Sequence, residues 1–233
     1  SRLKRMWRLE THPKKSAEAY GALLLGFLGQ SAPAVEGVAI GSVVPALTPV
    51  FQAASKRFFG HKALVVDHRL KLGIRYKVDR PDEVGADRIA NALAAFKLYG
   101  APAIVLDFGT ATTFDCISKN GYYEGGAILV GPRLAAEALA EKTAKLPKVE
   151  FAKPRRVIGK NTVECIQAGL YFGYLGMVDR VLEETLKEME PRPRILVTGG
   201  FGEIFGPLIS KKNVRVPDLT LQGLRLAYET QGR

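Results

Sequence analysis

The sequence of 233 residues predicts an α/β fold, because short apolar segments typical of strands alternate with longer segments typical of helices. Both halves of the chain show this alternation. Strands are expected at residues 2–11, 38–44, 64–66, 74–78, 104–106, 112–117, 195–197 and 214–216. Helices are expected at residues 17–28, around Phe51, Ala54 and Phe58, at 87–99 and 134–142, from Asn161 to about Glu188, and at 219–229.

Capping residues set the limits of these helices. Ser16 is a good N-cap for the first helix, and Gly29 ends it. Pro45 and Pro49 introduce the second helix, because proline is well tolerated in a first turn. The expected buried side of the first helix consists of Tyr20, Leu23, Leu24, Phe27 and Leu28.

The composition is that of an ordinary globular protein, with 47% hydrophobic and 24% charged residues. Cys116 and Cys165 lie in apolar segments without a CxxC pattern, so neither a disulfide framework nor a zinc site is expected, and a reducing cytoplasm fits. The first fifteen residues are basic and lack an apolar segment, so we expect no signal peptide. The apolar segment 32–54 is interrupted by glycine and proline, so we expect no membrane span.

A net charge of +11 favours anionic partners, such as nucleotides, phosphorylated metabolites or nucleic acid. The basic residues are scattered and lack interleaved aromatic residues. We therefore interpret them as solvated surface.

The segment 104–131 contains the strongest candidate for phosphate chemistry. Asp107 is the first charge after an apolar strand, and Gly109 permits a tight turn before the next strand. A glycine lets backbone N–H groups approach phosphate oxygens, and a carboxylate can hold a cation that offsets their charge. The alternative is an ordinary buried hairpin with an aspartate in its turn.

Asp87 is expected in the first turn of a helix that Gly100 closes. The amide donors and the helix dipole favour an ionised carboxylate there, which could accept a proton from a substrate hydroxyl. The alternative is an aspartate that only stabilises the helix. Arg88 could bind a substrate carboxylate through its planar guanidinium group or form a surface salt bridge.

The segment Gly159-Lys160-Asn161-Thr162 resembles a P-loop but does not satisfy the motif. Pro154 stands where the motif needs glycine, and Asn161 where it needs serine or threonine. A capping box formed by Asn161 and Glu164 is the better interpretation, and it would leave the Thr162 hydroxyl free for a ligand.

Two groups of glycines follow. Gly169, Gly173 and Gly176 form a small-residue face that allows close approach of a helix, and we expect internal packing rather than a partner subunit. Gly199 and Gly200, after the strand 195–197, would let the backbone pass close to a flat ligand such as a purine, or form a plain turn.

In this order and at these spacings, the motifs resemble type III pantothenate kinases. The matching segments are Val84-Gly-Ala-Asp-Arg, Asp107-Phe-Gly-Thr-Ala-Thr-Thr-Phe-Asp, Gly125-Gly-Ala-Ile, Gly159-Lys-Asn-Thr and Thr198-Gly-Gly. The resemblance implies two similar actin-like ATPase (ribonuclease H-like) domains, at 1–102 and 103–233, with a nucleotide cleft between them. It also implies phosphorylation of pantothenate by ATP, the first step towards coenzyme A, by a homodimer that uses Mg²⁺ and a monovalent cation (K⁺ or NH₄⁺).

The resemblance also implies roles for individual residues. Asp87 resembles the catalytic base, and Gly85, Ala86 and Arg88 resemble the rest of the pantothenate-binding loop. Asp107 looks like the monovalent-cation ligand. ATP contacts are implied for Gly109, Thr110, Gly199 and Gly200, and a substrate contact for Thr162.

Two departures from the family pattern stand out. Val78 replaces a tyrosine that is often found in the family, although Tyr76 is nearby. The family also opens with a strand hairpin carrying Asp-x-Gly-Asn-Thr, whereas this sequence begins at about the third strand. Roughly twenty residues, enough for two strands, are expected to precede it in the natural protein.

Two further readings remain open beside the kinase. A non-catalytic relative could act as a regulatory or binding module, which the missing front motif favours. Binding of nucleic acid by the basic surface is weaker, and we expect neither nucleic acid nor a membrane as a partner. The kinase reading places the protein in the cytoplasm.

Overall fold

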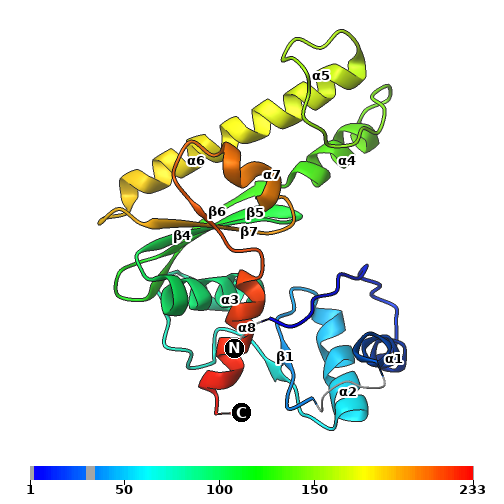
Figure 1. The fold of residues 1–233 in the computed structure, drawn as a ribbon, viewed down its shortest axis with the longest axis vertical. Coiled ribbons are helices and arrows are strands. Elements are labelled where there is room, and N and C mark those ends of the chain that lie inside the picture. Colours follow the sequence, from blue (N-terminus) through cyan, green and yellow to red (C-terminus); the bar gives the residue numbers. More distant parts are fainter. Residues whose placement is uncertain (1–2, 30–34, 233) are drawn as a thin grey trace. The chain divides into compact units, whose positions relative to one another are not determined.

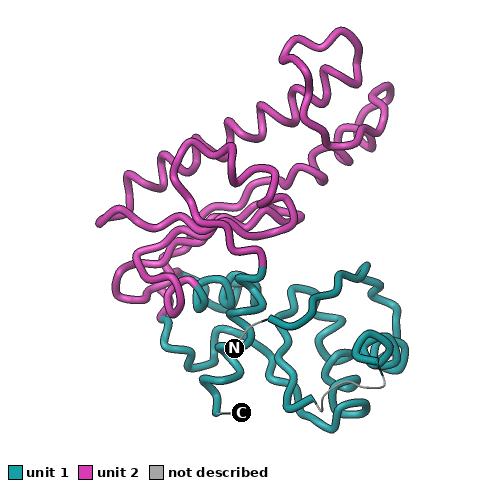
Figure 2. Tube along the Cα trace, viewed as in Figure 1, with its two compact units in different colours: residues 1–74, 79–94, 218–233 teal, residues 75–78, 95–217 magenta. Residues whose placement is uncertain are grey.

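The computed structural model describes residues 3–29 and 35–232, which fall into two compact units (Figures 1 and 2). The first unit comprises residues 1–74, 79–94 and 218–233, and the second comprises residues 75–78 and 95–217. The chain therefore leaves the first unit, builds most of the second and returns with its last helix.

A mixed six-stranded sheet forms the centre of the second unit, with the order β3-β6-β5-β4-β7-β8. Its strands are β3 (Arg75–Tyr76), β4 (Ala103–Phe108), β5 (Ala111–Ile117), β6 (Tyr122–Val130), β7 (Arg194–Thr198) and β8 (Val214–Arg215). The neighbours β4, β5 and β6 are antiparallel, whereas β7 runs parallel to β4. β4 is buried at nearly every position, as expected of a central strand.

One long helical segment packs on this sheet (Figure 1). It consists of α5 (Thr162–Ala168), a π-helical segment η4 (Gly169–Gly173) and α6 (Tyr174–Glu188). Tyr174, Val178 and Leu182 of α6 are buried against side chains of β4, β5 and β7. The other helical elements of the unit are η3 (Ala95–Tyr99), α4 (Pro132–Lys142), α7 (Gly202–Phe205) and η5 (Gly206–Leu208).

The first unit is built mainly from helices around two short parallel strands, β1 (Ala39–Ile40) and β2 (Leu64–Val65). The helices are α1 (Ala17–Leu28), η1 (Pro45–Leu47), α2 (Thr48–Phe59), η2 (Pro81–Glu83), α3 (Ala86–Ala94) and α8 (Leu219–Thr230). α8 packs so closely on α3 that a Cβ atom on Gly223 would lie 1.9 Å from the carbonyl oxygen of Ala90. The Thr220 hydroxyl also donates a hydrogen bond to Asn91 Oδ1 at 2.8 Å.

The predicted α/β fold is confirmed, and so are most of its elements. Ser16 caps α1 by accepting a hydrogen bond from Ala19 N, and the helix ends at Gly29 as predicted. The helix expected at 87–99 forms as α3, and its last turn is the π-helical segment η3. The strand expected at 38–44 shortens to β1, because Ser42 begins a turn by bonding to the backbone of Val44.

The strand expected at 2–11 was a wrong prediction. Residues 3–12 are exposed and form no strand, and Arg2 lies outside the described residues. Alternating apolar residues make a strand only where another strand satisfies the backbone, and no described strand pairs with this segment. Trp7 instead packs on Phe27 of α1, with ring centroids 5.6 Å apart.

Internal packing of the glycine face was also a wrong prediction. No atom would lie within 4 Å of a Cβ at Gly169, Gly173 or Gly176, so this face is open. The opposite face carries bulky apolar side chains, which gain far more from burial than glycine does. Those side chains decide which face of the helix packs on the sheet.

The predicted domains 1–102 and 103–233 remain a prediction. The compact units differ from them mainly because α8, which follows the whole second unit in the chain, packs on α3. Within residues 3–29 and 35–232, no helix combines the length and the apolar character needed to cross a membrane.

The contact between α3 and α8 predicts a specific sensitivity to added volume. Gly223→Ala should lower the free energy of unfolding by about 1–3 kcal/mol, because the new methyl group would overlap the Ala90 backbone. Gly26→Ala is the matched control, since Gly26 is an exposed helical glycine with open space around it, and alanine should stabilise α1 by up to about 1 kcal/mol. Urea unfolding of both variants checks this. Equal effects of the two substitutions would contradict the close helix contact.

Candidate active site

Four predicted substrate-binding residues, Gly85 to Arg88, lie together at the start of α3 in the first unit. Asp87 is half-buried in the first turn, as predicted, and its Oδ1 accepts a hydrogen bond from Arg88 N at 2.8 Å. That bond uses one of the free amide donors of the helix start. Ala86 is buried and Arg88 is half-buried.

Gly85 provides the space in which the Asp87 carboxylate lies. A Cβ atom at Gly85 would be 2.6 Å from Asp87 Oδ1 and 3.4 Å from the Val43 side chain. Any larger residue would push the carboxylate away from its position. Steric fit therefore explains why a glycine stands two positions before Asp87.

The predicted cation and ATP residues of the second unit meet at the tip of the β4–β5 hairpin. Asp107 is half-buried in β4 and pairs with Thr113 of β5. The turn contains Gly109, whose N–H donates to Ala111 O at 3.1 Å, and the exposed Thr110. The hairpin and its acidic tip form as the sequence predicts.

The glycine turn after β7 lies directly against this tip. Thr198 pairs with Asp107, and the next residue, Gly199, has a φ of +85°. A Cβ atom on Gly199 would be 2.5 Å from Asp107 Oδ1 and from Phe108 N. The Phe201 N–H donates to Phe108 O at 3.1 Å and fastens the turn to the hairpin. Gly199 thus adjoins Asp107.

The donor set at the tip fits a cation that is bound mainly by substrate oxygens and water. In residues 3–29 and 35–232, no group of three or more His, Cys, Asp or Glu side chains is placed to hold a metal ion. Asp107 supplies one carboxylate, so the other ligands of a monovalent cation here would come from the substrate and water. The arrangement is not that of a structural metal site, in which the protein supplies most of the ligands.

Thr162 is the exposed first residue of α5, which lies away from the sheet in Figure 1. The capping box forms nearly as predicted, since Asn161 Oδ1 accepts from Glu164 N at 2.9 Å. The Glu164 carboxylate accepts a hydrogen bond from Lys160 N at 2.9 Å rather than from Asn161 N. This bond is the main cause of the lowered pKa of Glu164. Thr162 itself remains exposed, as the capping interpretation requires.

Two contacts of the hairpin were missed by the sequence analysis. Gly131 N donates to Thr110 O at 3.1 Å, and a Cβ at Gly131 would lie 2.2 Å from that oxygen. The signal that could have identified Gly131 is its position directly before Pro132, where a strand ends and a helix starts. The second contact joins the hydroxyls of Thr112 and Tyr174, which are 62 positions apart, and no local signal predicts it.

Comparison with known proteins agrees with the geometry. A family profile for type III pantothenate kinase matches residues 1–184. The type III pantothenate kinase of Moorella thermoacetica is 44% identical over 230 residues, which cover 97% of this chain and 91% of that protein. One from Dehalococcoides mccartyi is 43% identical, over 96% of this chain and 88% of that protein.

A solved structure supports the fold alone. It is a conserved putative Baf family transcriptional activator from Campylobacter jejuni, with a TM-score of 0.55 and 16% sequence identity. The similarity covers 85% of this chain and 84% of that chain.

The chain has a mixed α/β fold in which an acidic hairpin lies beside a glycine turn. It belongs to the type III pantothenate kinase family.

The contact between Gly199 and Asp107 predicts that a side chain at residue 199 destabilises the fold in two ways. It strains the backbone, as at any position with positive φ, and it also overlaps neighbouring atoms. Gly199→Ala should lower the free energy of unfolding by at least about 1 kcal/mol more than Gly100→Ala does. Both glycines have similar positive φ values, +85° and +87°, but only Gly199 has atoms within 4 Å of the added Cβ. Chemical unfolding of the two variants measures the difference, and equal losses would mean that strain alone matters at Gly199.

Proposed function

We propose that this protein transfers the γ-phosphoryl group of ATP to pantothenate and forms 4′-phosphopantothenate, the first step of coenzyme A biosynthesis. The observation that carries the proposal is membership of the type III pantothenate kinase family, with 44% identity to a relative of that name across 97% of the chain. The carboxylates of Asp87 and Asp107, each at a defined position in its unit, supply the chemistry that this reaction needs.

In the proposed mechanism, Asp87 acts as the general base. Its carboxylate accepts the proton of the pantothenate hydroxyl while the hydroxyl oxygen bonds to the γ-phosphorus of ATP and the bond from that phosphorus to ADP breaks. The Arg88 N–H and the space left by Gly85 hold the carboxylate in place. Arg88 would bind the pantothenate carboxylate through its guanidinium group, and the exposed hydroxyl of Thr162 would also bind substrate.

The hairpin tip would bind the nucleotide. Asp107 would hold a cation at the phosphates, and the backbone around Gly109, Thr110, Gly199 and Gly200 would approach ATP closely, since three of these positions have no side chain. Mg²⁺ and K⁺ or NH₄⁺ are the proposed cations, and when bound they offset the negative charge of the phosphates.

The protein is proposed to work in the cytoplasm without a membrane or nucleic acid as partner. Some of the basic side chains are paired with carboxylates on the surface, among them Arg57 with Glu18, Arg180 with Glu184, and Arg225 with Glu229. Ion pairs of this kind are typical of solvated surface. They support the interpretation of the basic residues as solvated surface.

A homodimer is the proposed assembly, and the open face of the long helix is its proposed interface. Besides Gly169, Gly173 and Gly176, this face exposes Phe172 and Met177, each to at least 40%. A two-fold axis perpendicular to the helix would pair this face with the same face of a second copy in the antiparallel direction. That direction would also bring the basic segment before α5, with Arg155, Arg156 and Lys160, towards Glu188 at the end of α6.

The kinase proposal predicts that the protein forms ADP in the presence of pantothenate, with turnover that needs Mg²⁺ and is higher in K⁺ or NH₄⁺ than in Na⁺. Asp87→Asn should lower kcat by about 10²–10⁴, because it removes the proton acceptor. A coupled ADP assay measures turnover, and circular dichroism verifies that the variant folds.

Asp82→Asn is the control for this experiment. Asp82 is an exposed aspartate five positions earlier and pairs with Arg80 on the surface, so turnover should change little. If Asp87→Asn kept near-normal turnover, the role of Asp87 as base would be wrong. Nucleotide binding by the wild type without any turnover would instead favour the alternative function, a non-catalytic binding module.

The dimer proposal predicts that Gly173→Leu weakens self-association by at least about tenfold, because the side chain would hold two helices apart. Light scattering across a range of protein concentrations measures this. Gly26→Leu, at an exposed helical glycine of the first unit with equally open surroundings, should leave association unchanged. A monomeric wild type, or a Gly173→Leu variant that associates normally, would reject this interface.

A further inference from the structure

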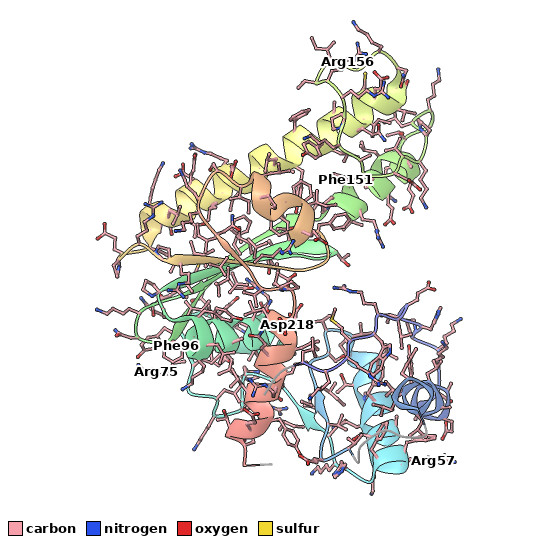
Figure 3. The ribbon with its side chains drawn as sticks, in the orientation of Figure 1. Arg57, Arg75, Phe96, Phe151, Arg156 and Asp218 are labelled. Carbon is pink, nitrogen blue, oxygen red and sulfur yellow. The ribbon has the colours of Figure 1, made fainter. Side chains whose placement is uncertain are left out.

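The side chains beneath the β4–β5 hairpin form an almost entirely apolar cluster. Its centre is aromatic, with Phe205 stacked on Phe108 at 5.7 Å and 4.6 Å from the ring of Tyr174. Phe151, labelled in Figure 3, adds a ring 5.3 Å from Phe205. Within this cluster, a hydrogen bond joins the hydroxyls of Tyr174 on α6 and Thr112 on β5.

Both partners of this hydrogen bond are buried. Thr112 has no exposed surface and Tyr174 is 2% exposed. Burial raises the pKa of the Tyr174 phenol to about 12. Either hydroxyl can be the donor in this bond.

Thr112 occupies a special position in the hairpin. It pairs directly with Phe108, the last residue of β4 before the turn at Gly109 and Thr110. The carbonyl of Phe108 also accepts the hydrogen bond from Phe201 that fastens the Gly199–Gly200 turn. A contact that fixes the position of Thr112 therefore also fixes the position of the strand ends that flank the turn.

Tyr174 is placed by the irregular part of the long helix. It is the first residue of α6 and directly follows the π-helical segment η4. A π-helical turn includes an extra residue and rotates the side chains that follow it. Tyr174 and Val178 then lie on the buried face.

Overall stability does not explain why the pair is polar. A valine and a phenylalanine would fill nearly the same volume, and replacing both partners of a buried hydrogen bond by apolar groups can be nearly neutral. A hydrogen bond is directional, so it fixes the orientation and the separation of its two side chains more closely than an apolar contact does. The pair is suited to holding the hairpin at one position relative to α6.

We propose that Tyr174 is a positioning residue for the nucleotide: through Thr112 it holds the base of the β4–β5 hairpin so that Asp107, Gly109 and Thr110 keep the geometry that ATP phosphates require. This inference rests on the proposed function, because it takes the hairpin tip to be the ATP site. Tyr174 does not contact the nucleotide in this proposal, and it acts only through the strand.

Three variants test the proposal: Tyr174→Phe, Thr112→Val and the double variant. Tyr174→Phe leaves the Thr112 hydroxyl buried without its partner, so it should lower the melting temperature and weaken MgATP binding by about tenfold, the scale of one lost hydrogen bond. The double variant should recover most of the melting temperature but not the MgATP affinity. KM for pantothenate should stay within about twofold in all three, because only the nucleotide side is affected.

Two controls separate positioning from packing. Tyr171→Phe removes a hydroxyl from the same aromatic cluster, 6.2 Å from Phe205 between ring centroids, and should leave MgATP affinity unchanged. Thr112→Ser keeps the hydroxyl and should retain the affinity of the wild type. Isothermal titration calorimetry with MgATP and differential scanning calorimetry give the two readouts independently of turnover.

The outcomes distinguish this inference from the proposed function. If the double variant recovers both melting temperature and MgATP affinity, or if Tyr174→Phe binds MgATP normally, the pair is purely structural and the positioning role is rejected. If the wild type binds MgATP but does not phosphorylate pantothenate, the proposed function fails while the titrations still decide the role of Tyr174. If the wild type does not bind MgATP, both fail.

Discussion

The backbone of Gly199 lies so close to Asp107 and Phe108 that no side chain fits between them, and the arrangement of the second unit depends on this contact. The contact requires that β7 run parallel to β4 with Thr198 opposite Asp107, and the hydrogen bond from Phe201 to Phe108 then closes the turn. Two segments about ninety residues apart thereby become one backbone surface around a carboxylate. Most of the predicted nucleotide residues belong to this surface, so their function depends on strand register more than on individual side chains.

Features with a local cause could be predicted from the sequence. Ser16 and Gly29 delimit α1 because capping depends only on nearby backbone groups, and the same holds for Asn161 at the start of α5. The hairpin was predictable because an apolar strand, a charge and a glycine turn follow one another directly. Asp87 falls in a first helical turn for the same kind of reason.

Features that depend on distant partners could not be predicted. The alternation at residues 3–12 is a valid strand pattern, but a strand also needs a neighbour, and the pattern does not reveal whether one exists. The glycines of the long helix indicate close packing without indicating against what, and they are open. The hydrogen bond between Tyr174 and Thr112 requires both the sheet order and the rotation caused by η4, which a single sequence does not encode in any short segment.

The return of α8 to the first unit has a consequence for synthesis of the protein on the ribosome. α3, which carries Asp87 in its first turn, packs on α8 through Gly223 and through Thr220, which bonds to a residue 129 positions earlier. Because chains emerge from the N-terminus, the second unit has left the ribosome before α8 can reach α3. The helix bearing the proposed base therefore gains the support of α8 only after the second unit can already fold.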